Sequence, residues 1–390
     1  MTASVQLPFL QPHPLEPPPD LCALQATGPI HRIRTAVGDE AWLVTGYPEV
    51  RRLMDAELLG RAHRDPAKAP RSRTSAIFGG PVGEFDTELA DHTRMRHLLQ
   101  PHFSPKHMRT LEPKVERLCA ELLDDLERIG PPADLLTNLA RPLPVLVICD
   151  LLGVPYADRN RFQLWVDDAA FGSDDAVSEA GLGALLDYGM ELVAHKRDHP
   201  ADDVISRLCD EPGLSDADIA RLAMMLLFAG HETTMLQIWL DAVLLLSNPD
   251  QWQMLLDDPE LIGRAVEELL RTGMPGGIGV PRYARADIDV DGVTIRAGDL
   301  VLLDPGAANH DPAVFPEPYR LDINRVGTSH VGFGYGLHYW VGAALARMEL
   351  KTVFAQIIPR FPNMRLSVEP TLATGFHSLS HGLVALPVSW

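Results

Sequence analysis

The chain has 390 residues, of which 46% are hydrophobic and 22% charged, the composition of an ordinary folded globular protein. Its 34 Lys and Arg residues against 53 Asp and Glu residues give a net charge of -19. This charge repels phosphate groups, so it excludes nucleic acid and anionic membrane surfaces as partners.

Residues 1–20 form a Pro-rich leader without the basic start, apolar run and small-residue cleavage site of a secretion signal. The most apolar long stretch, residues 222–246, is interrupted by His231, Glu232, Gln237 and Asp241. Such polar interruptions are typical of a buried helix and not of a membrane span. We therefore expect a cytoplasmic protein with no membrane partner.

The cysteines are scattered through the chain without the spacing of a metal site. A cytoplasmic chain of this size has no need of disulfides, so we expect all of them to be core residues. They are Cys22, Cys119, Cys149 and Cys209.

The first clear elements are a hairpin and a helix. Residues 30–45 alternate in polarity around the turn Gly38-Asp39, which predicts a two-stranded hairpin. Residues 105–129 carry apolar side chains at three- and four-residue spacing, which predicts an amphipathic helix. Further helices are expected at residues 144–152, 181–195 and 259–272.

The longest helix is expected to open at Ser215, where Asp218 completes a capping box, and to close before Asn248-Pro249. From residue 281 to residue 322 the pattern changes to short strands, IDVDGVTI and LVLLDPG, flanked by turns. A last helix is expected at residues 342–359. Since no repeat or linker divides the chain, we predict one mainly α domain, residues 1–390, with a small β-sheet side.

The most specific motif is GFGYGLHYWVG at residues 332–342, followed by a helical pattern. Gly334 and Gly336 permit a tight turn, and the N-terminus of the following helix favours an anionic group. This segment resembles the cysteine-ligand loop of the cytochrome P-450 family, in which it lies beneath the haem. The resemblance implies the P-450 fold, haem b with its iron, and oxidoreductase activity of the monooxygenase type, with Phe333, Gly334 and Gly342 as haem-binding positions.

Other segments match the family in the same chain order, so the resemblance covers nearly the whole chain. Ala-Gly-His-Glu-Thr-Thr at residues 229–234 is similar to the oxygen-activation motif, which implies catalytic, proton-relaying roles for Glu232 and Thr233. Taken alone, these residues indicate either a functional groove or a satisfied polar network in a buried helix, with equal weight.

A second matching segment is the pair Glu268 and Arg271, which resembles the family's Glu-x-x-Arg motif, with Arg320 as its third member. The resemblance implies a structural role. Spacing leads to the same view, because an acid and a base three residues apart on a helix form a fold-stabilising ion pair more often than a catalytic site.

Four further positions match those that hold the haem propionates in the family: His92, Arg96, Arg282 and His338. The arginine fork suits carboxylates. Each residue alone is more typical of a surface charge or a satisfied histidine, and only their common register with the other motifs favours the haem site.

The sequence departs from the family at Trp340, which stands where the iron-binding cysteine is expected. An indole offers only an N–H donor, so it cannot replace a thiolate. The family depends on that thiolate for cleavage of dioxygen, and its loss predicts loss of ordinary hydroxylation. His338, two residues away, is chemically able to bind iron.

Substrate recognition is expected to come from loops and from one groove of the long helix. We predict that the loop at residues 62–89 sets specificity. The predicted substrate-lining residues are Met225, Ala229, Ile278 and Leu379.

Four functional hypotheses follow. The first is a haem-binding P-450-like protein acting on a lipophilic small molecule in natural-product metabolism, with a ferredoxin and ferredoxin reductase as redox partners. The second is a haem-free catalyst of cyclisation, isomerisation or hydration. The third is an auxiliary partner of a glycosyltransferase, and the fourth is a working monooxygenase in which Trp340 is an engineered or erroneous codon.

Overall fold

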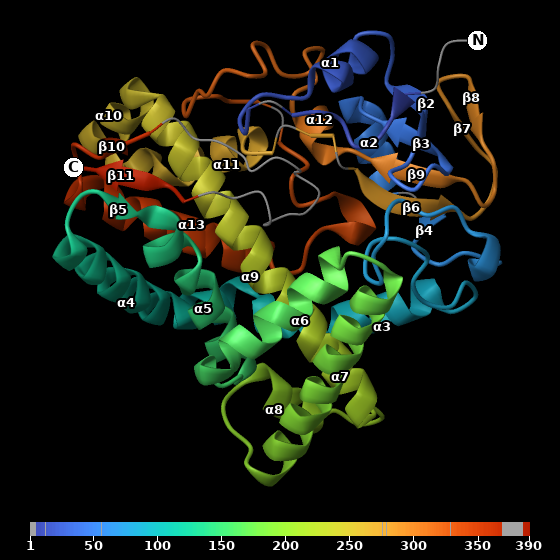
Figure 1. The fold of residues 1–390 in the computed structure, drawn as a ribbon, viewed down its shortest axis with the longest axis horizontal. Helices are drawn as coiled ribbons and strands as arrows, with labels where there is room; N and C mark the ends of the chain where they lie inside the picture. Colours follow the sequence, from blue (N-terminus) through green and yellow to red (C-terminus); the bar gives the residue numbers. More distant parts are fainter. Residues whose placement is uncertain are drawn as a thin grey trace. The chain divides into compact units, whose positions relative to one another are not determined.

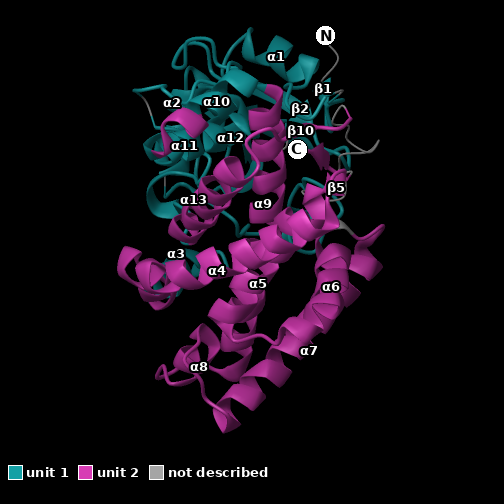
Figure 2. Ribbon diagram, turned by 90° about the vertical axis from the view of Figure 1, so that its left-hand side faces the viewer, with its two compact units in different colours: residues 1–97, 248–254, 260–341 teal, residues 98–247, 255–259, 342–390 magenta. Residues whose placement is uncertain are grey.

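The computed structural model describes residues 5–390 except 12, 56, 275, 278, 328 and 369–384, and the side chain of residue 171. Figure 2 shows the chain as two compact units. The first unit comprises Met1–His97, Asn248–Met254 and Glu260–Val341, and the second comprises Leu98–Ser247, Leu255–Pro259 and Gly342–Trp390. The expectation of one domain over residues 1–390 stays a prediction.

The first unit contains a mixed sheet of short strands, seen on the right-hand side of Figure 1. Its order is β1-β2-β3-β9-β6-β4. The predicted hairpin is confirmed, because β2 and β3 pair antiparallel from Ile30 opposite Val44 to Arg34 opposite Glu40. A separate two-stranded sheet is formed by β7 and β8. The strands are β1 (Val5–Gln6), β2 (Ile30–Arg34), β3 (Glu40–Val44), β4 (Leu59–Gly60), β6 (Val280–Ala284), β7 (Ile288–Val290), β8 (Val293–Ile295) and β9 (Leu300–Leu303).

Short helices pack on this sheet. The α2 helix contributes Val50 and Leu53 to a buried cluster with Val301 of β9 and Phe315. Burial of such apolar side chains fixes α2 on the sheet and leaves its polar face in solvent. The helices lying mainly in this unit are α1 (Pro19–Gln25), α2 (Tyr47–Met54), α3 (Glu88–Leu99), α10 (Pro249–Asp257), α11 (Ile262–Thr272) and α12 (Pro305–Asn309).

Long helices make up most of the second unit. The central α9 packs against α5, α7 and α13 and is buried on nearly all sides after residue 233. A three-stranded sheet, β10-β11-β5, completes the unit. The elements are α4 (Pro105–Ile129), α5 (Pro142–Leu152), α6 (Arg159–Phe171), α7 (Asp175–Asp198), α8 (Val204–Cys209), α9 (Asp216–Ser247), α13 (Ala343–Arg360), β5 (Ala133–Asp134), β10 (Arg365–Leu366) and β11 (Pro387–Ser389).

The capping box predicted at the start of α9 is confirmed. The Asp218 amide donates to the Ser215 hydroxyl at 3.2 Å, and the Ser215 amide donates to the Asp218 carboxylate at 3.3 Å. Two otherwise free amides of the first turn are thereby satisfied. Within the part of the chain that the structure describes, no helix is apolar and long enough to serve as a membrane span.

Single turns of other helix types connect these elements. They are the 3-10 turns η1 (Pro66–Lys68), η2 (Gln100–Phe103), η4 (Tyr156–Asp158), η5 (Pro259–Leu261) and η6 (Gly336–His338), and the π-helical turn η3 (Leu136–Ala140). The predicted fold class, mainly α with a small sheet, is confirmed.

Candidate functional site

The loop that carries Trp340 is a tightly turned segment of the first unit. Gly334 and Gly336 have φ values of 77° and 57°, in the left-handed region that glycine tolerates best. The amide of Trp340 donates to the carbonyl of Phe333 at 2.8 Å, which closes the loop. A Cβ on Gly336 would also meet the Asp55 side chain, so the left-handed φ and this close neighbour both favour glycine here.

No cysteine lies in this loop, and Trp340 is half-buried. Cys119 and Cys149 are buried in helices of the second unit, and desolvation raises the pKa of each thiol to about 12. Cys22 and Cys209 are half-buried elsewhere. Because a thiol with a raised pKa does not form a thiolate at neutral pH, neither buried cysteine is suited to bind a metal.

Four predicted site residues come together in the first unit, and we call them the cation cluster: His92, Arg96, Arg282 and His338. The rings of His92 and His338 lie edge to face, with centroids 4.9 Å apart. Arg96 donates to the carbonyl of Tyr339, and Arg282 donates to the carbonyl of Pro281 at 2.8 Å. Helix α3, strand β6 and the loop before Trp340 thus contribute to one cluster.

Burial and mutual repulsion set the charge state of the cluster. Burial, followed by the charges of Arg282, His92 and Arg96, lowers the pKa of His338 to about 4. Burial is also the main cause that lowers the pKa of His92, and it lowers the pKa of Arg282 to about 10. At neutral pH both imidazoles of the cluster are therefore neutral, because the pKa of each lies below its ordinary value of 6.5.

No acid among the described residues forms an ion pair with a member of the cation cluster, although the charge of Glu88 acts on His92 and Arg282. The nearby acid Glu88 forms an ion pair with Arg285 at 2.8 Å. Moreover, the Nδ1 atom of His92 is buried without a hydrogen-bond partner in the described part of the chain. Groups of this kind call for a ligand with carboxylates, because an unpaired buried cation or ring nitrogen is costly.

The residues present fit the propionates of haem but do not fit its iron. The cation cluster has the charge and the donors to hold two propionates. The loop offers no thiolate for the iron, since residue 340 is tryptophan and the indole has no free lone pair. The cluster therefore fits the carboxylates, whereas the loop does not fit the iron ligation that the family uses.

The predicted relay residues lie on α9 in the second unit. The Glu232 side chain is buried, 2% exposed, with a carboxyl oxygen 3.4 Å from Nε2 of His231. The exposed Thr233 hydroxyl donates to the carbonyl of Ala229 at 2.9 Å. Met225 and Ala229 are half-buried one turn apart on the same helix. The other two predicted lining residues, Ile278 and Leu379, lie outside the described residues.

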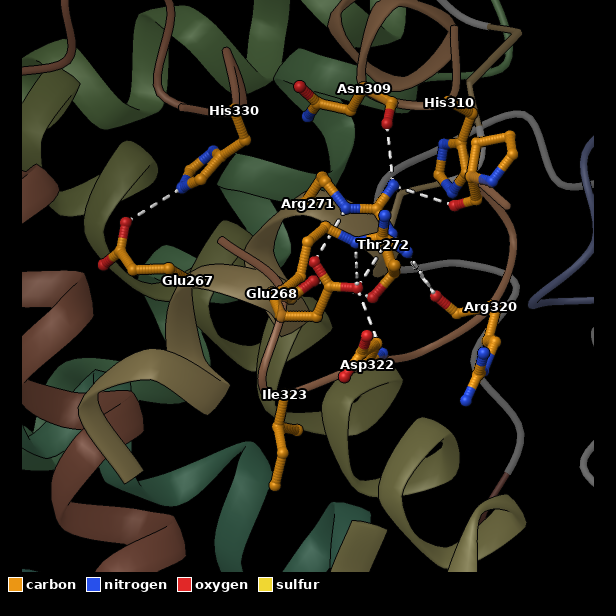
Figure 3. Close-up of polar contacts among 12 residues, drawn as sticks. Glu267, Glu268, Arg271, Thr272, Asn309, His310, Arg320, Asp322, Ile323 and His330 are labelled. Carbon is orange, nitrogen blue, oxygen red and sulfur yellow. Dashed lines mark hydrogen bonds and ion pairs between the residues drawn. The ribbon is translucent and has the colours of Figure 1, made fainter. Parts of the chain in front are cut away.

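Figure 3 shows the ion pair predicted on α11, with Glu268 and Arg271 buried at 5% and 2% exposure. Arg271 donates twice to Glu268, at 2.8 and 2.9 Å. It also donates to the carbonyls of Asn309 and Pro318, both at 2.8 Å. The pair therefore ties α11 to the segment that follows α12.

The third member of this group was predicted wrongly. The Arg320 side chain is 62% exposed and pairs with Glu317 at 3.1 Å, pointing away from Glu268 in Figure 3. The second cation that binds Glu268, beside Arg271, is Arg325, with Nε 3.0 Å from the carboxylate. The path of the turn from Arg320 to Arg325 determines which of the two side chains meets Glu268. Along this path it is the backbone carbonyl of Arg320 that accepts hydrogen bonds from Arg271 and Arg325.

Two buried acids of the second unit were not predicted as site residues. The Glu349 carboxyl of α13 is fully buried, and neither of its oxygens has a hydrogen-bond partner among the described residues. Asp241 of α9 is also buried, and accepts from Gln237 at 2.6 Å. Burial raises the pKa of both carboxyls well above their ordinary values. Only Asp241 gave a signal in the sequence, as a polar interruption of an apolar stretch.

Known proteins match the chain over its whole length. The family model described as cytochrome P-450 matches residues 191–371. The chain is 41% identical over 397 residues to pentalenolactone synthase of Streptomyces exfoliatus, covering 99% of each chain. It is 40% identical to mycinamicin IV hydroxylase/epoxidase of Micromonospora griseorubida, covering 94% of each chain.

Solved structures lead to the same assignment. The substrate-free structure of a polyene macrolide antibiotic pimaricin epoxidase is 37% identical and superposes with a TM-score of 0.89, covering all of both chains. The identity and coverage of these relatives, together with the loop, the cation cluster and the buried Glu268–Arg271 pair, leave one family that accounts for them. The chain belongs to the cytochrome P-450 family.

Proposed function

We propose that this protein binds haem b through its carboxylates, binds a lipophilic small molecule of natural-product metabolism, and lacks the thiolate chemistry of its relatives. The observation that carries the proposal is the cation cluster of His92, Arg96, Arg282 and His338, in which no member forms an ion pair with an acid among the described residues. Without haem these half-buried groups would have no carboxylate partner, and the Nδ1 atom of His92 would stay buried without a hydrogen-bond partner among the described residues.

The substrate class rests on the relatives. Their names describe the synthesis of pentalenolactone, the hydroxylation and epoxidation of mycinamicin IV, and the epoxidation of pimaricin. We propose that this chain likewise acts on a lipophilic small molecule in the cytoplasm. If electrons are required, a ferredoxin and its reductase are the proposed donors. The negative net charge is consistent with a protein that binds neither nucleic acid nor anionic membranes.

Haem with a thiolate ligand supplies the activation of dioxygen in this family. Trp340 removes that ligand, so the proposal does not include ordinary hydroxylation. The polar groups of α9 remain available for proton chemistry: the Thr233 hydroxyl can donate a proton to a ligand, and the Glu232 carboxyl can hold one. Met225 and Ala229 on α9 are proposed to contact the apolar part of the substrate.

Trp340 also supports a second candidate, a haem-free catalyst. In that account the pocket binds the apolar substrate directly, and Glu232 and Thr233 promote cyclisation, isomerisation or hydration by moving protons. This reaction class requires no iron ligand, which is its advantage over the first candidate. The haem-free candidate, however, gives the cation cluster no role.

Haem content separates the two candidates. The purified protein is supplied with haem, and bound haem is quantified by its pyridine complex and its absorption spectrum. We expect binding, with a reduced carbon monoxide complex that lacks the red-shifted band of thiolate ligation. Arg282→Gln and His338→Gln should lower haem retention, whereas Arg296→Gln, which removes an exposed arginine paired with Asp287, should not. Absence of haem binding by a folded protein would favour the haem-free catalyst.

The small-molecule role is tested separately from haem. Titration calorimetry with a panel of terpenoid and polyketide-like compounds should detect binding of at least some members, because small-molecule sites are lined mainly by apolar side chains such as those proposed here, Met225 and Ala229. Failure of every compound to bind folded protein would exclude a role in the metabolism of lipophilic small molecules.

A further inference from the structure

The segment at residues 70–79, which we call the 70–79 loop, lies inside the region predicted to set specificity. Its start is tied to the sheet of the first unit. The Tyr283 hydroxyl donates to the carbonyl of Pro70 at 2.7 Å, and the Arg71 amide donates to the Asp39 carboxylate at 2.7 Å. These bonds reach strand β6 and the β2–β3 turn, so the loop is anchored on two sides.

Two buried serines hold the interior of the 70–79 loop. The Ser72 amide donates to the carbonyl of Gly79 at 2.7 Å, and its hydroxyl donates to the carbonyl of Phe78 at 2.7 Å. The Ser75 hydroxyl accepts from the Phe78 amide at 3.1 Å. The chain closes so tightly that a Cβ on Gly79 would lie 2.3 Å from the carbonyl oxygen of Arg73. Arg73 is thus presented by a fixed loop.

Arg73 differs from the other arginines of this region, which have partners. Arg61 donates to the carbonyl of Ile77 at 2.8 Å, Arg64 lies over the Phe85 ring at 4.9 Å, and Arg285 pairs with Glu88. The Arg73 side chain is half-buried, and within the described part of the chain its guanidinium forms no hydrogen bond, ion pair or ring contact.

Withdrawal of this guanidinium from water is costly without an anion to compensate. Burial lowers the pKa of Arg73, and no charged group contributes to the shift. A carboxylate suits the site best, because it takes two parallel hydrogen bonds from the arginine fork. Since the protein supplies no such group here among its described residues, the carboxylate must come from a ligand.

We infer that Arg73 binds the carboxylate of the small-molecule ligand, so that the lipophilic substrate of this protein is an organic acid. The inference rests on the proposed function and narrows its substrate class.

Haem propionates are a second source of carboxylates, and the electrostatics argue against them. The members of the cation cluster act on one another, since Arg282, His92 and Arg96 all lower the pKa of His338. Arg73 is not among the charges that shift the pKa of His92, Arg282 or His338. We therefore assign to Arg73 a carboxylate other than the haem propionates.

Abietic acid and its methyl ester form a matched probe, because they share one apolar skeleton and differ in charge. We expect calorimetry to show the acid binding the unaltered protein more tightly than the ester by about 10- to 100-fold, as for a charge-assisted hydrogen bond. Arg73→Gln should abolish this difference, and Arg73→Lys should retain part of it. Arg64→Gln, which removes an exposed arginine of the same segment, is the control and should retain the preference.

Three results of these experiments would contradict the inference, each for a different reason. Equal binding of acid and ester by the unaltered protein would exclude carboxylate recognition while leaving the small-molecule role intact. Binding of neither compound would count against both. If Arg73→Gln lowers haem content measured by the pyridine complex, Arg73 holds a propionate and the substrate assignment is wrong.

Discussion

At residue 340 a single side chain separates this protein from the chemistry of its relatives. The surrounding backbone is suited to a ligand loop, with left-handed glycines at 334 and 336 and the amide of residue 340 bonded to Phe333. Helix α13 begins at Ala343, three residues further along the chain. The partial positive charge at a helix N-terminus would lower the pKa of a thiol placed at residue 340.

Trp340→Cys is therefore expected to supply the missing thiolate. When haem is bound and reduced under carbon monoxide, the variant should gain the red-shifted absorption band that the unaltered protein lacks. Trp340→Ser is the matched control, because it removes the same bulk without adding sulfur, and it should not gain the band. If the unaltered protein already shows the red-shifted band, Trp340 does not prevent thiolate ligation and this prediction is wrong.

The burial of Glu349 should make the free energy of unfolding depend on pH. Its carboxyl is buried and unpartnered among the described residues, so its pKa in the folded protein lies well above the value of 4.5 expected for an exposed glutamate. Below pH 4.5 both folded and unfolded chains hold this proton. As the pH rises above 4.5, the unfolded chain releases it first, so the folded state loses stability.

We expect Glu349→Gln to remove this loss. Its free energy of unfolding should exceed that of the unaltered protein at pH 8, and the gap should close as the pH falls toward 4.5, by up to about 1.4 kcal/mol per pH unit. Urea denaturation across this pH range provides the measurement. Glu121→Gln, at an exposed position of α4, should show no such trend. A gap that does not change with pH would refute the argument.

At the scale of elements, the Glu268 carboxylate joins α11 to the segment that contains Arg325. Removing Glu268 leaves the buried Arg271 without its carboxylate, and removing Arg271 leaves Glu268 with Arg325 as its remaining cation, so breaking this buried network costs up to about 3 to 5 kcal/mol. Glu268→Ala and Arg271→Ala should therefore unfold the protein or lower its melting temperature strongly. An unchanged melting temperature in either variant would refute the structural assignment.

The arginine pair of this segment provides an internal comparison. Arg325→Ala should destabilise the protein measurably, because it breaks a half-buried pair with Glu268. Arg320→Ala should change the free energy of unfolding by less than about 0.5 kcal/mol, as is usual for an exposed residue. Thermal denaturation of the two variants side by side measures this difference, and the reverse ranking would favour the original sequence-based assignment of Arg320.

Elements with strong local signals could be predicted from the sequence. The apolar stripe of α4, with Pro105 at its start and Gly130 after its end, gave both boundaries correctly. For α7 only residues 181–195 were predicted, whereas the helix spans Asp175–Asp198, because its first turns lack an apolar period. Helices α6 and α8 were not predicted, since α6 has a weak apolar stripe and α8 is only six residues long.

At the scale of the whole molecule, the motifs of the sequence led to the family and to the fold class, and both are confirmed. The site was less accessible to prediction. Whether Arg320 or Arg325 meets Glu268 depends on the path of a turn, and the lack of partners for Arg73 and Glu349 depends on contacts between distant segments. Such properties belong to tertiary packing and leave no local pattern in the sequence.

The strand order of the six-stranded sheet has a consequence for behaviour at high concentration. Its two outermost strands, β1 and β4, are only two residues long. An exposed edge strand can form backbone hydrogen bonds with a strand of a neighbouring molecule. Short outer strands limit this pairing because they offer few free N–H and C=O groups. Because β1 covers β2 through Val5 and Gln6, loss of residues 1–8 would uncover a five-residue edge and open a route to association of chains.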